Sequence, residues 1–154
     1  FGRSISTGPG LALGADGINM GTRFCVTQEA PIPMAFKEQM VANDERQTDL
    51  IFRTLHNTAR VMRNEVSQAV VEIERAGGAK FEDVQHLVAG TRGRDALANG
   101  DTQGGIWSAG MVQGLIHDIP TVQELVDRIV SEAEDLIRGR LAGMVTTSAR
   151  AAAE

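Results

Sequence analysis

The stretch that decides the fold is Gly14-Ala15-Asp16-Gly17-Ile18-Asn19-Met20-Gly21-Thr22-Arg23-Phe24, which lies close to the start of the 154-residue chain. A turn of small residues is followed by a pattern typical of a short buried strand, residues 17–20, and then by the pair Gly21-Thr22. Glycine lets the backbone approach a ligand closely, and a turn after a strand can direct N–H groups at an anion. The stretch therefore predicts a strand that ends in an anion-binding turn.

In a (β/α)8 barrel such a turn lies at the ligand-binding rim, and the phosphate subsite is commonly built from the loops after strands seven and eight. We interpret residues 17–20 as the last barrel strand. Gly21 and Thr22 then offer a phosphate two main-chain N–H groups and one hydroxyl. A complete barrel needs about 250 residues, so a last strand this early predicts that most of the barrel lies outside the sequence.

Further motifs follow along the chain: Thr27-Gln28-Glu29-Ala30, then Asn-Thr-Ala-Arg-Val at 57–61, Gly-Gly-Ile-Trp-Ser-Ala-Gly at 104–110, and Asp118-Ile119-Pro120. Together with the first stretch they resemble the nitronate monooxygenase family, formerly called 2-nitropropane dioxygenases. The resemblance extends over residues 11–143. The flavin-type enoyl-acyl-carrier-protein reductases share this architecture and much of the first motif.

The resemblance implies an α/β fold, the C-terminal part of an FMN-binding (β/α)8 TIM barrel with an inserted, mostly helical cap. It divides the chain into the barrel end with its eighth strand and phosphate loop (1–26), the cap or substrate domain (27–115), the closing barrel helix (116–143) and a frayed tail (144–154). Residues 1–10 depart from the family pattern, because the chain is too short after them for the helix that family members have there.

The resemblance also implies an activity for the full-length parent: oxidation of alkyl nitronates by O2 to carbonyl compounds and nitrite, with bound FMN. The alternatives are an enoyl-thioester reductase that uses FMN and NAD(P)H, and a non-catalytic α/β fragment. The expected partners are a small nitronate and O2. The expected location is the cytoplasm, because the sequence shows no secretory leader and no run near the ~20 apolar residues of a membrane span.

The resemblance assigns FMN contacts to five residues. Gly21 and Thr22 bind the phosphate, and the backbone of Met20 lies beside it. Ser108 and Gly110 belong to a glycine-rich, helix-opening stretch that reaches from the cap back to the flavin ring. A small hydroxyl residue there can form a hydrogen bond with the edge of the ring without blocking it.

No histidine is expected to act as the catalytic base. His56, His86 and His117 lie beside turns or on the polar side of a short helix, which is typical of surface histidines. In the nitronate monooxygenases that the chain resembles, the catalytic histidine comes from an earlier barrel strand. The sequence therefore predicts no catalytic residue in this chain, and no metal site, because the histidines lack metal-ligand spacing.

Two residues that occur once each invite a chemical interpretation. Cys25 is the single cysteine, which excludes an internal disulfide. We expect it to be a packing residue rather than a nucleophile, since no base is visibly paired with it. Trp107, the single tryptophan, is interpreted either as a pocket wall or as a core residue.

The charge pattern limits the partners. A formal net charge of −5 argues against nonspecific nucleic-acid binding, which needs a basic surface. Arginines do cluster at Arg46, Arg53, Arg60 and Arg63, but acidic residues alternate with them, and we interpret them as a solvated face of mixed charge. Neither a nucleic acid nor a membrane is expected as a partner, and no particular oligomeric state is predicted.

Helical spacing of apolar residues predicts three cap helices, over residues 34–42, 65–76 and 81–89. Asn64 is a suitable N-cap for the second helix, and Gly77-Gly78 supplies its C-terminal stop. In the third helix four residues are expected to face inward: Phe81, Val84, Leu87 and Val88.

Three further elements are predicted from composition and capping. Residues 48–55 are rich in strand formers, whereas residues 90–103 are polar and glycine-rich and predict a loop. The capping box from Thr121 to Glu124 predicts one continuous helix over residues 121–138. Eight apolar residues are expected on its least exposed face: Val122, Leu125, Val126, Ile129, Val130, Ala133, Leu136 and Ile137.

The expected position of the base outside this sequence gives a direct test. We expect the 154-residue chain alone to show no nitronate-dependent oxygen uptake above the rate of free FMN. Oxygen-electrode assays with an alkyl nitronate measure this rate. Uptake clearly above the free-flavin rate would show that the base lies within the chain.

Overall fold

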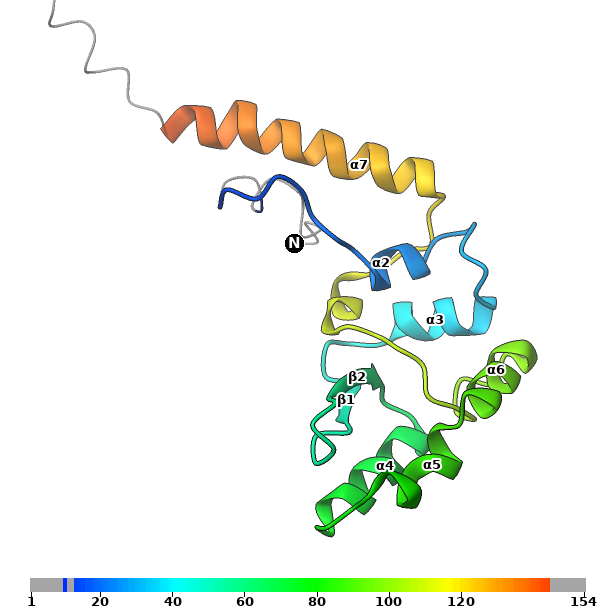
Figure 1. The fold of residues 1–154 in the computed structure, drawn as a ribbon. Helices are drawn as coiled ribbons and strands as arrows, with labels where there is room; N and C mark the ends of the chain where they lie inside the picture. The colour runs from blue at the N-terminus through cyan, green and yellow to red at the C-terminus, as the bar shows by residue number, and fades with distance from the viewer. Residues whose placement is uncertain (1–9, 11–12, 145–154) are drawn as a thin grey trace, which may run out of the picture. The chain divides into compact units, whose positions relative to one another are not determined.

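The computed structural model describes residues 10 and 13–144 (Figure 1). They form two compact units: a larger unit, residues 20–120, and a smaller unit made of the residues before 20 and after 120. The expectations for residues 1–9, and for the tail from residue 145 onward, lie outside the described residues. The predicted four-part division at residues 26, 115 and 143 stays a prediction.

One half of the larger unit is built from the short helix α2 (Thr22–Cys25), the helix α3 (Met34–Ala42) and the 3-10 helix η1 (Met111–Leu115). The bounds of α3 confirm the helix predicted there. The rings of Phe36 and Trp107 meet edge to face with centroids 4.8 Å apart. Trp107 is therefore a core residue. A single cluster fills this half: Val26, Phe36, Met40, Met62, Trp107, Ala109 and Ile116.

The other half begins with an antiparallel hairpin of β1 (Thr48–Ile51) and β2 (Ala59–Met62). The strand predicted over 48–55 ends early, because Phe52 takes a φ of 61° and the chain turns there. The strand β2 was not predicted by the sequence patterns. It forms because Val61 and Met62 can be buried while the hairpin turn returns the chain to β1.

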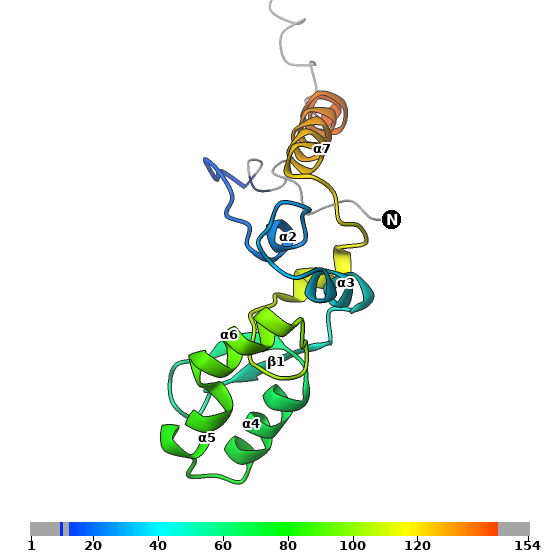
Figure 2. The ribbon, with the colours of Figure 1, turned by 90° about the vertical axis from the view of Figure 1, so that its right-hand side faces the viewer.

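Three helices follow the hairpin: α4 (Glu65–Arg75), α5 (Phe81–Val88) and α6 (Gly90–Asn99). Both views show α4 and α5 side by side next to the hairpin (Figures 1 and 2). Asn64 caps α4 as predicted: its side chain accepts from the Ser67 N–H, and the Ser67 hydroxyl accepts from the Asn64 N–H, both at 2.9 Å. Buried Ile51, Val61, Val70 and Val84 form the core of this half.

The loop predicted over residues 90–103 is wrong for residues 90–99, which form α6, and correct for residues 100–103. The Arg-Asp-Ala-Leu-Ala run at 94–98 has enough helix propensity to offset two glycines. One of the two, Gly93, permits close packing instead: a Cβ added to Gly105 would lie 2.9 Å from the Gly93 Cα. Gly100, with a φ of 70°, ends the helix in the left-handed conformation that glycine favours.

The inward face predicted for α5 is partly wrong. Val84 is fully buried, and Leu87 and Val88 pack against the core of this half. Phe81, however, is 49% exposed. It begins the helix directly after the mostly exposed turn at 77–80, where little of the chain is placed to cover it.

The strand predicted over residues 17–20 is not formed in the described structure. Gly17, Ile18 and Asn19 are exposed and Met20 is half-buried. A strand is stabilised by hydrogen bonds to neighbouring strands, and the described residues offer none beside this segment. The sequence pattern alone cannot replace those lateral partners.

In the smaller unit the helix α7 (Val122–Asp135) begins with the predicted capping box, in which Thr121 N–H donates to Glu124 Oε2 at 2.8 Å. The chain continues as the π-helical segment η2 (Leu136–Leu141) and the short 3-10 helix η3 (Ala142–Met144). The predicted continuous helix over residues 121–138 is therefore confirmed, with a change from α- to π-helical hydrogen bonding at Leu136. None of the helices described is long and apolar enough to cross a membrane.

The apolar face predicted for α7 is narrower than expected. Leu125, Ile129 and Ala133, spaced by four residues, are the buried ones. The prediction is wrong for three other positions, because Val126, Val130 and Ile137 are 38%, 51% and 43% exposed. Val126 and Val130 each follow a buried residue directly, and successive residues lie about 100° apart around a helix axis. A contact face as narrow as this one therefore leaves them exposed to solvent.

A buried lysine fixes the turn between α2 and α3. Lys37 is 2% exposed, and its ammonium donates to the carbonyls of Thr27, Gln28 and Ala30 at 2.6, 3.1 and 2.9 Å. Three convergent carbonyls satisfy the three donors of an ammonium group. The turn therefore depends on the side chain of Lys37.

Replacement of Lys37 by Met should destabilise the chain by roughly 3 kcal/mol, because three carbonyls, of which the Thr27 carbonyl is buried, lose a charged donor. Urea unfolding, with circular dichroism as the signal, measures the change. Lys80→Met is the matched control, since Lys80 is exposed. Equal stabilities of the two variants would contradict the proposed importance of the buried ammonium.

Candidate functional site

The pair Gly21-Thr22 opens the short helix α2. Gly21 is its N-cap, and the Gly21 carbonyl accepts from the N–H groups of Phe24 and Cys25 at 3.0 and 3.2 Å. The first N–H groups of a helix have no partner within it. Gly21 is exposed, and a Cβ added there would meet no atom within 4 Å. The N–H groups of this turn therefore adjoin open space in which an anion can approach.

A hydrogen bond joins the two segments that the sequence assigned to FMN. The N–H of Gly110 donates to the Thr22 hydroxyl oxygen at 2.9 Å, across 88 positions of sequence. A hydroxyl that accepts one hydrogen bond still has its own proton to donate. A Cβ at Gly110 would lie 3.2 Å from that oxygen, so glycine is the residue that fits this approach.

Ser108 lies two residues before Gly110 and faces solvent. Its backbone forms an isolated antiparallel bridge with Val61 of β2, and the N–H of Met62 donates to the Trp107 carbonyl at 3.0 Å. Trp107 and Ala109 are buried while Ser108 is exposed, as expected for alternation along an extended segment. The helix predicted to open in this stretch begins only at Met111, as the 3-10 helix η1.

A hydrogen bond thus joins Thr22 and Gly110 in the structure. Ser108 lies two residues before Gly110 and is exposed. Met20 is half-buried and directly precedes the Gly21 turn. No contact described in the structure links the Met20 side chain to the other four residues. The FMN contacts assigned to all five residues stay predictions.

An ion pair between a buried arginine and a partly exposed aspartate supports this site, and the sequence patterns did not single it out. Arg23 is 8% exposed; its guanidinium donates to the Asp118 carboxylate at 2.7 Å and to the Asp118 carbonyl at 3.1 Å. The Gln28 N–H donates to the Pro120 carbonyl at 2.9 Å. Two features of the sequence could have identified this pair: Arg23 directly follows the Gly-Thr pair, and Asp118 begins the Asp-Ile-Pro motif.

The structure places the three histidines at exposed positions: His56 in the hairpin turn, His86 on α5 and His117 after η1. Cys25 is half-buried and packs against the core around Trp107, which confirms its packing role. Within the described part of the chain, no three His, Cys, Asp or Glu side chains are grouped so that they could hold a metal ion.

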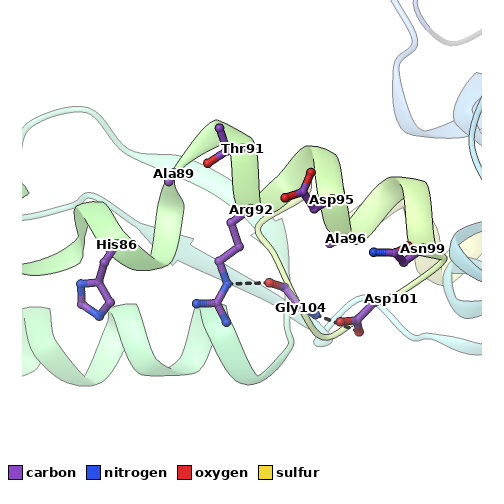
Figure 3. A pocket seen from close by; sticks show the side chains of 9 residues that line it. All are labelled: His86, Ala89, Thr91, Arg92, Asp95, Ala96, Asn99, Asp101 and Gly104. Carbon is purple, nitrogen blue, oxygen red and sulfur yellow. Dashed lines mark hydrogen bonds between the residues drawn. The ribbon is translucent and has the colours of Figure 1, made fainter.

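A cavity of about 420 Å³ lies between α5, α6 and the loop that follows α6 (Figure 3). The Arg92 Nε donates to the Gly104 carbonyl at 2.6 Å, and the Gly104 N–H donates to Asp101 Oδ1 at 3.0 Å. Figure 3 shows His86 at one end of the cavity and Asp101 at the other. Because Arg92 and Asp101 hold the loop against α6, we interpret this cavity as a structural feature.

The hydrogen bond between Thr22 and Gly110 can be tested without any ligand. Thr22→Val should speed hydrogen exchange of the Gly110 amide by roughly five- to tenfold, because a net hydrogen bond contributes about 1 kcal/mol. Thr22→Ser keeps the hydroxyl and should keep the slow exchange. Exchange is followed by NMR or mass spectrometry. An amide that exchanges equally fast in the wild type and Thr22→Val would rule out the hydrogen bond.

Similarity to known proteins agrees with this arrangement. Two proteins named (3aS,4S,5R,7aS)-5-hydroxy-7a-methyl-1-oxo-octahydro-1H-indene-4-carboxyl-CoA dehydrogenase, from Rhodococcus jostii and Mycobacterium tuberculosis, are 27% and 25% identical to this chain. Each match covers 80% of the chain and 45% or 44% of the relative. The chain therefore spans less than half the length of these curated relatives.

Solved structures of FabK from Thermotoga maritima resemble the whole fold. The wild-type structure matches with a TM-score of 0.79 at 28% identity, and a mutant form with 0.72 at 27%. Both matches cover 92% of this chain and 45% or 43% of FabK. The likeness confirms the predicted fold class, an α/β chain that is part of a TIM barrel with a mostly helical insertion.

The sequence profile of the nitronate monooxygenase family matches residues 3–132, which is most of the chain. This range includes the Gly21-Thr22 turn, the hairpin, the cap helices and the segment that ends at Gly110. The chain therefore belongs to the nitronate monooxygenase family.

Proposed function

We propose that this chain is part of an FMN-dependent oxidoreductase and that Gly21, Thr22 and Gly110 form its phosphate anchor. The observation that carries the proposal is the 2.9 Å hydrogen bond from the Gly110 N–H to the Thr22 hydroxyl. It joins a turn suited to phosphate with the segment that the family resemblance assigns to the flavin ring. Family membership supports the same cofactor.

The residues of the anchor fit the phosphate of FMN. A phosphate needs several donors and space for its oxygens, and the turn offers the first N–H groups of α2 beside an unfilled position at Gly21. The Thr22 hydroxyl accepts from Gly110 and donates its own proton to the anion. Arg23 holds the turn in place through Asp118 and is not needed as a phosphate ligand.

FMN, when bound, supplies the redox chemistry, and the protein positions it and excludes water. Ser108 is exposed and lies two residues from Gly110 on the same extended segment. We assign its hydroxyl to the edge of the flavin ring, and the backbone of Met20 to the phosphate. No residue of this chain is assigned as the base.

The curated relatives support an acyl thioester as the substrate class, because both are named as dehydrogenases of a carboxyl-CoA compound. The FMN- and NAD(P)H-dependent thioester reductase is accordingly our first candidate for the parent. Oxidation of alkyl nitronates by O2 is the second, and the family profile supports it. NAD(P)H oxidation that requires an enoyl thioester, compared with nitronate-dependent oxygen uptake, distinguishes the two in the full-length parent.

The phosphate anchor gives a quantitative test in the full-length parent. Thr22→Val should weaken FMN binding by roughly ten- to a hundredfold, because a hydrogen bond to a charged group contributes about 1.5–3 kcal/mol. Gly21→Val should weaken it further, since its side chain fills the space where the phosphate approaches. Flavin fluorescence recovered on dilution measures the dissociation constant.

Asn19→Ala is the matched control, because Asn19 is an exposed polar residue next to the anchor but not part of it. Its affinity for FMN should stay within about twofold of the wild type. Equal FMN affinities for the wild type, Thr22→Val and Gly21→Val would refute the phosphate anchor. Absence of bound FMN from the parent would favour the non-catalytic alternative.

A further inference from the structure

A groove of about 570 Å³ lies between the β1–β2 hairpin and the C-terminal half of α4. This volume is in the range of small-molecule sites, about 300–1,000 Å³. Four arginines line it, together with two carboxylates: Arg53, Arg60, Arg63 and Arg75, with Asp49 and Glu74. Its formal charge is therefore positive, although the whole chain is acidic.

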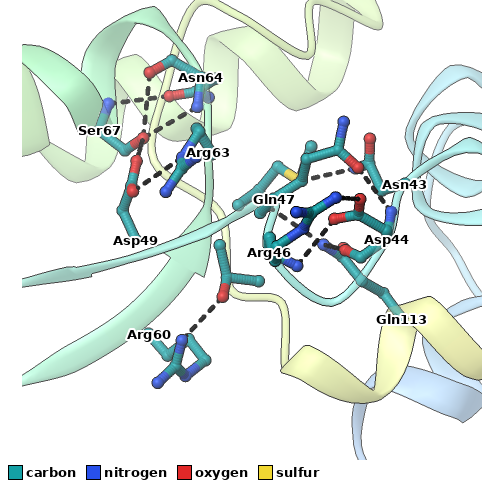
Figure 4. Close-up of polar contacts among 12 residues, drawn as sticks. Asn43, Asp44, Arg46, Gln47, Asp49, Arg60, Arg63, Asn64, Ser67 and Gln113 are labelled. Carbon is teal, nitrogen blue, oxygen red and sulfur yellow. Dashed lines mark hydrogen bonds and ion pairs between the residues drawn. The ribbon is translucent and has the colours of Figure 1, made fainter.

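The two carboxylates are already bound by the protein. The Glu74 carboxylate is buried and accepts from the Phe52 N–H at 3.0 Å, the Thr54 N–H at 3.2 Å and the Thr54 hydroxyl at 2.9 Å. Asp49 accepts from the Arg63 Nε at 3.0 Å and the Ser67 hydroxyl at 2.8 Å (Figure 4). These bonds hold the hairpin against α4 and neutralise only part of the positive charge.

The guanidinium groups keep free donors. Arg60 uses one nitrogen, which donates to the Thr48 hydroxyl at 2.7 Å. Among the described residues, Arg53 and Arg75 have no ion pair or side-chain hydrogen bond, and both are exposed. Five N–H donors on each guanidinium leave many directed at solvent. The groove therefore offers several phosphate-binding forks within one small site.

The arginine cluster seen in the sequence divides in the structure. Arg46 lies outside the groove and pairs with Asp44 at 3.2 Å. The hydrogen bond from the Arg46 backbone N–H, aided by its guanidinium, lowers the pKa of the Asp44 carboxyl. Arg75 of α4 joins Arg53 and Arg60 instead, so three separate segments of chain bring positive charge to the groove.

We propose that this groove binds an adenosine diphosphate with a further phosphate on its ribose, the group that coenzyme A carries as the 3′-phosphate and NADPH as the 2′-phosphate. Guanidinium forks pair with phosphate oxygens in two parallel hydrogen bonds, and their flat faces stack on a base. Leu50 and Val71 add an apolar wall for the adenosine. The inference rests on the proposed function, since a flavin reductase of thioesters uses one or both of these ligands.

The groove is close enough to the phosphate anchor for this role. Arg60 directly precedes Val61, which pairs with Ser108, and Gly110 two residues further on contacts Thr22. Bridged strands and short extended segments make this path no longer than about 20 Å. In coenzyme A, the extended arm between the adenosine diphosphate and the thiol bridges such a distance; in NADPH the nicotinamide riboside follows the diphosphate directly and reaches less far.

Titration calorimetry with coenzyme A and with NADPH, on the full chain and on its variants, tests the proposal. Arg53→Gln and Arg75→Gln should each weaken the tighter of the two ligands about tenfold, the loss expected for one charge-assisted hydrogen bond. Dephospho-coenzyme A or NADH, which lack the extra ribose phosphate, should bind more weakly than the matching parent ligand. The tighter ligand identifies the source of the phosphorylated adenosine diphosphate.

Arg94→Gln is the matched control, since Arg94 is an exposed arginine on α6, outside the groove, that forms an ion pair with the neighbouring Asp95 at 3.6 Å. Affinities that stay unchanged in Arg53→Gln and Arg75→Gln, or no saturable binding of either ligand, would overturn the proposal. FMN affinity is measured separately by flavin fluorescence. An FMN affinity that Thr22→Val and Gly21→Val leave unchanged would refute the phosphate anchor alone. Coenzyme affinities that Arg53→Gln and Arg75→Gln leave unchanged would refute the groove alone.

Discussion

The buried ammonium of Lys37 is the interaction on which the larger unit depends. A lysine that is almost fully removed from water must have its donors satisfied, and the carbonyls of Thr27, Gln28 and Ala30 do so. The positive charge between those carbonyls offsets the repulsion of their converging oxygens. Because they belong to the chain that leaves α2, the lysine sets where the Gly21-Thr22 turn stands relative to α3.

Two further polar contacts then close the unit from its beginning to its end. The Arg23 guanidinium binds Asp118, and the Thr22 hydroxyl binds the Gly110 N–H, across 95 and 88 positions of sequence. Gln113 adds a third link, since its buried amide donates to the carbonyls of Asp44 and Gln47 at 3.0 and 3.1 Å. These links hold the proposed phosphate anchor in place before any ligand binds, and such preorganisation reduces the entropy lost on binding.

In the hairpin half, the acidic and basic side chains have different roles. Its carboxylates, Asp49 and Glu74, serve backbone and hydroxyl donors and hold the hairpin on α4, while the arginines beside them keep most of their donors. A mixed sequence of acids and bases therefore folds into a surface on which one sign of charge remains available. Val61, the neighbour of Arg60 in β2, pairs with Ser108, so this bridge connects the proposed groove to the segment that ends at Gly110.

The sequence alone determined the elements whose signals are local. The bounds of α3, the Asn64 cap, the glycine stop after α4 and the capping box of α7 depend on residues within a few positions of one another. Family motifs, which are also local strings, identified the fold class and the Gly21-Thr22 turn.

Only the tertiary structure decided what depends on distant partners. The strand β2 forms through pairing with β1, α6 is a helix because glycines at 93 and 105 allow close packing, and residues 17–20 form no strand without lateral neighbours. The links from Arg23 to Asp118 and from Thr22 to Gly110, and the separation of Arg46 from the arginine groove, join residues that no short pattern connects. Hydrogen bonding and burial between remote segments are properties of the folded chain, and local propensity does not contain them.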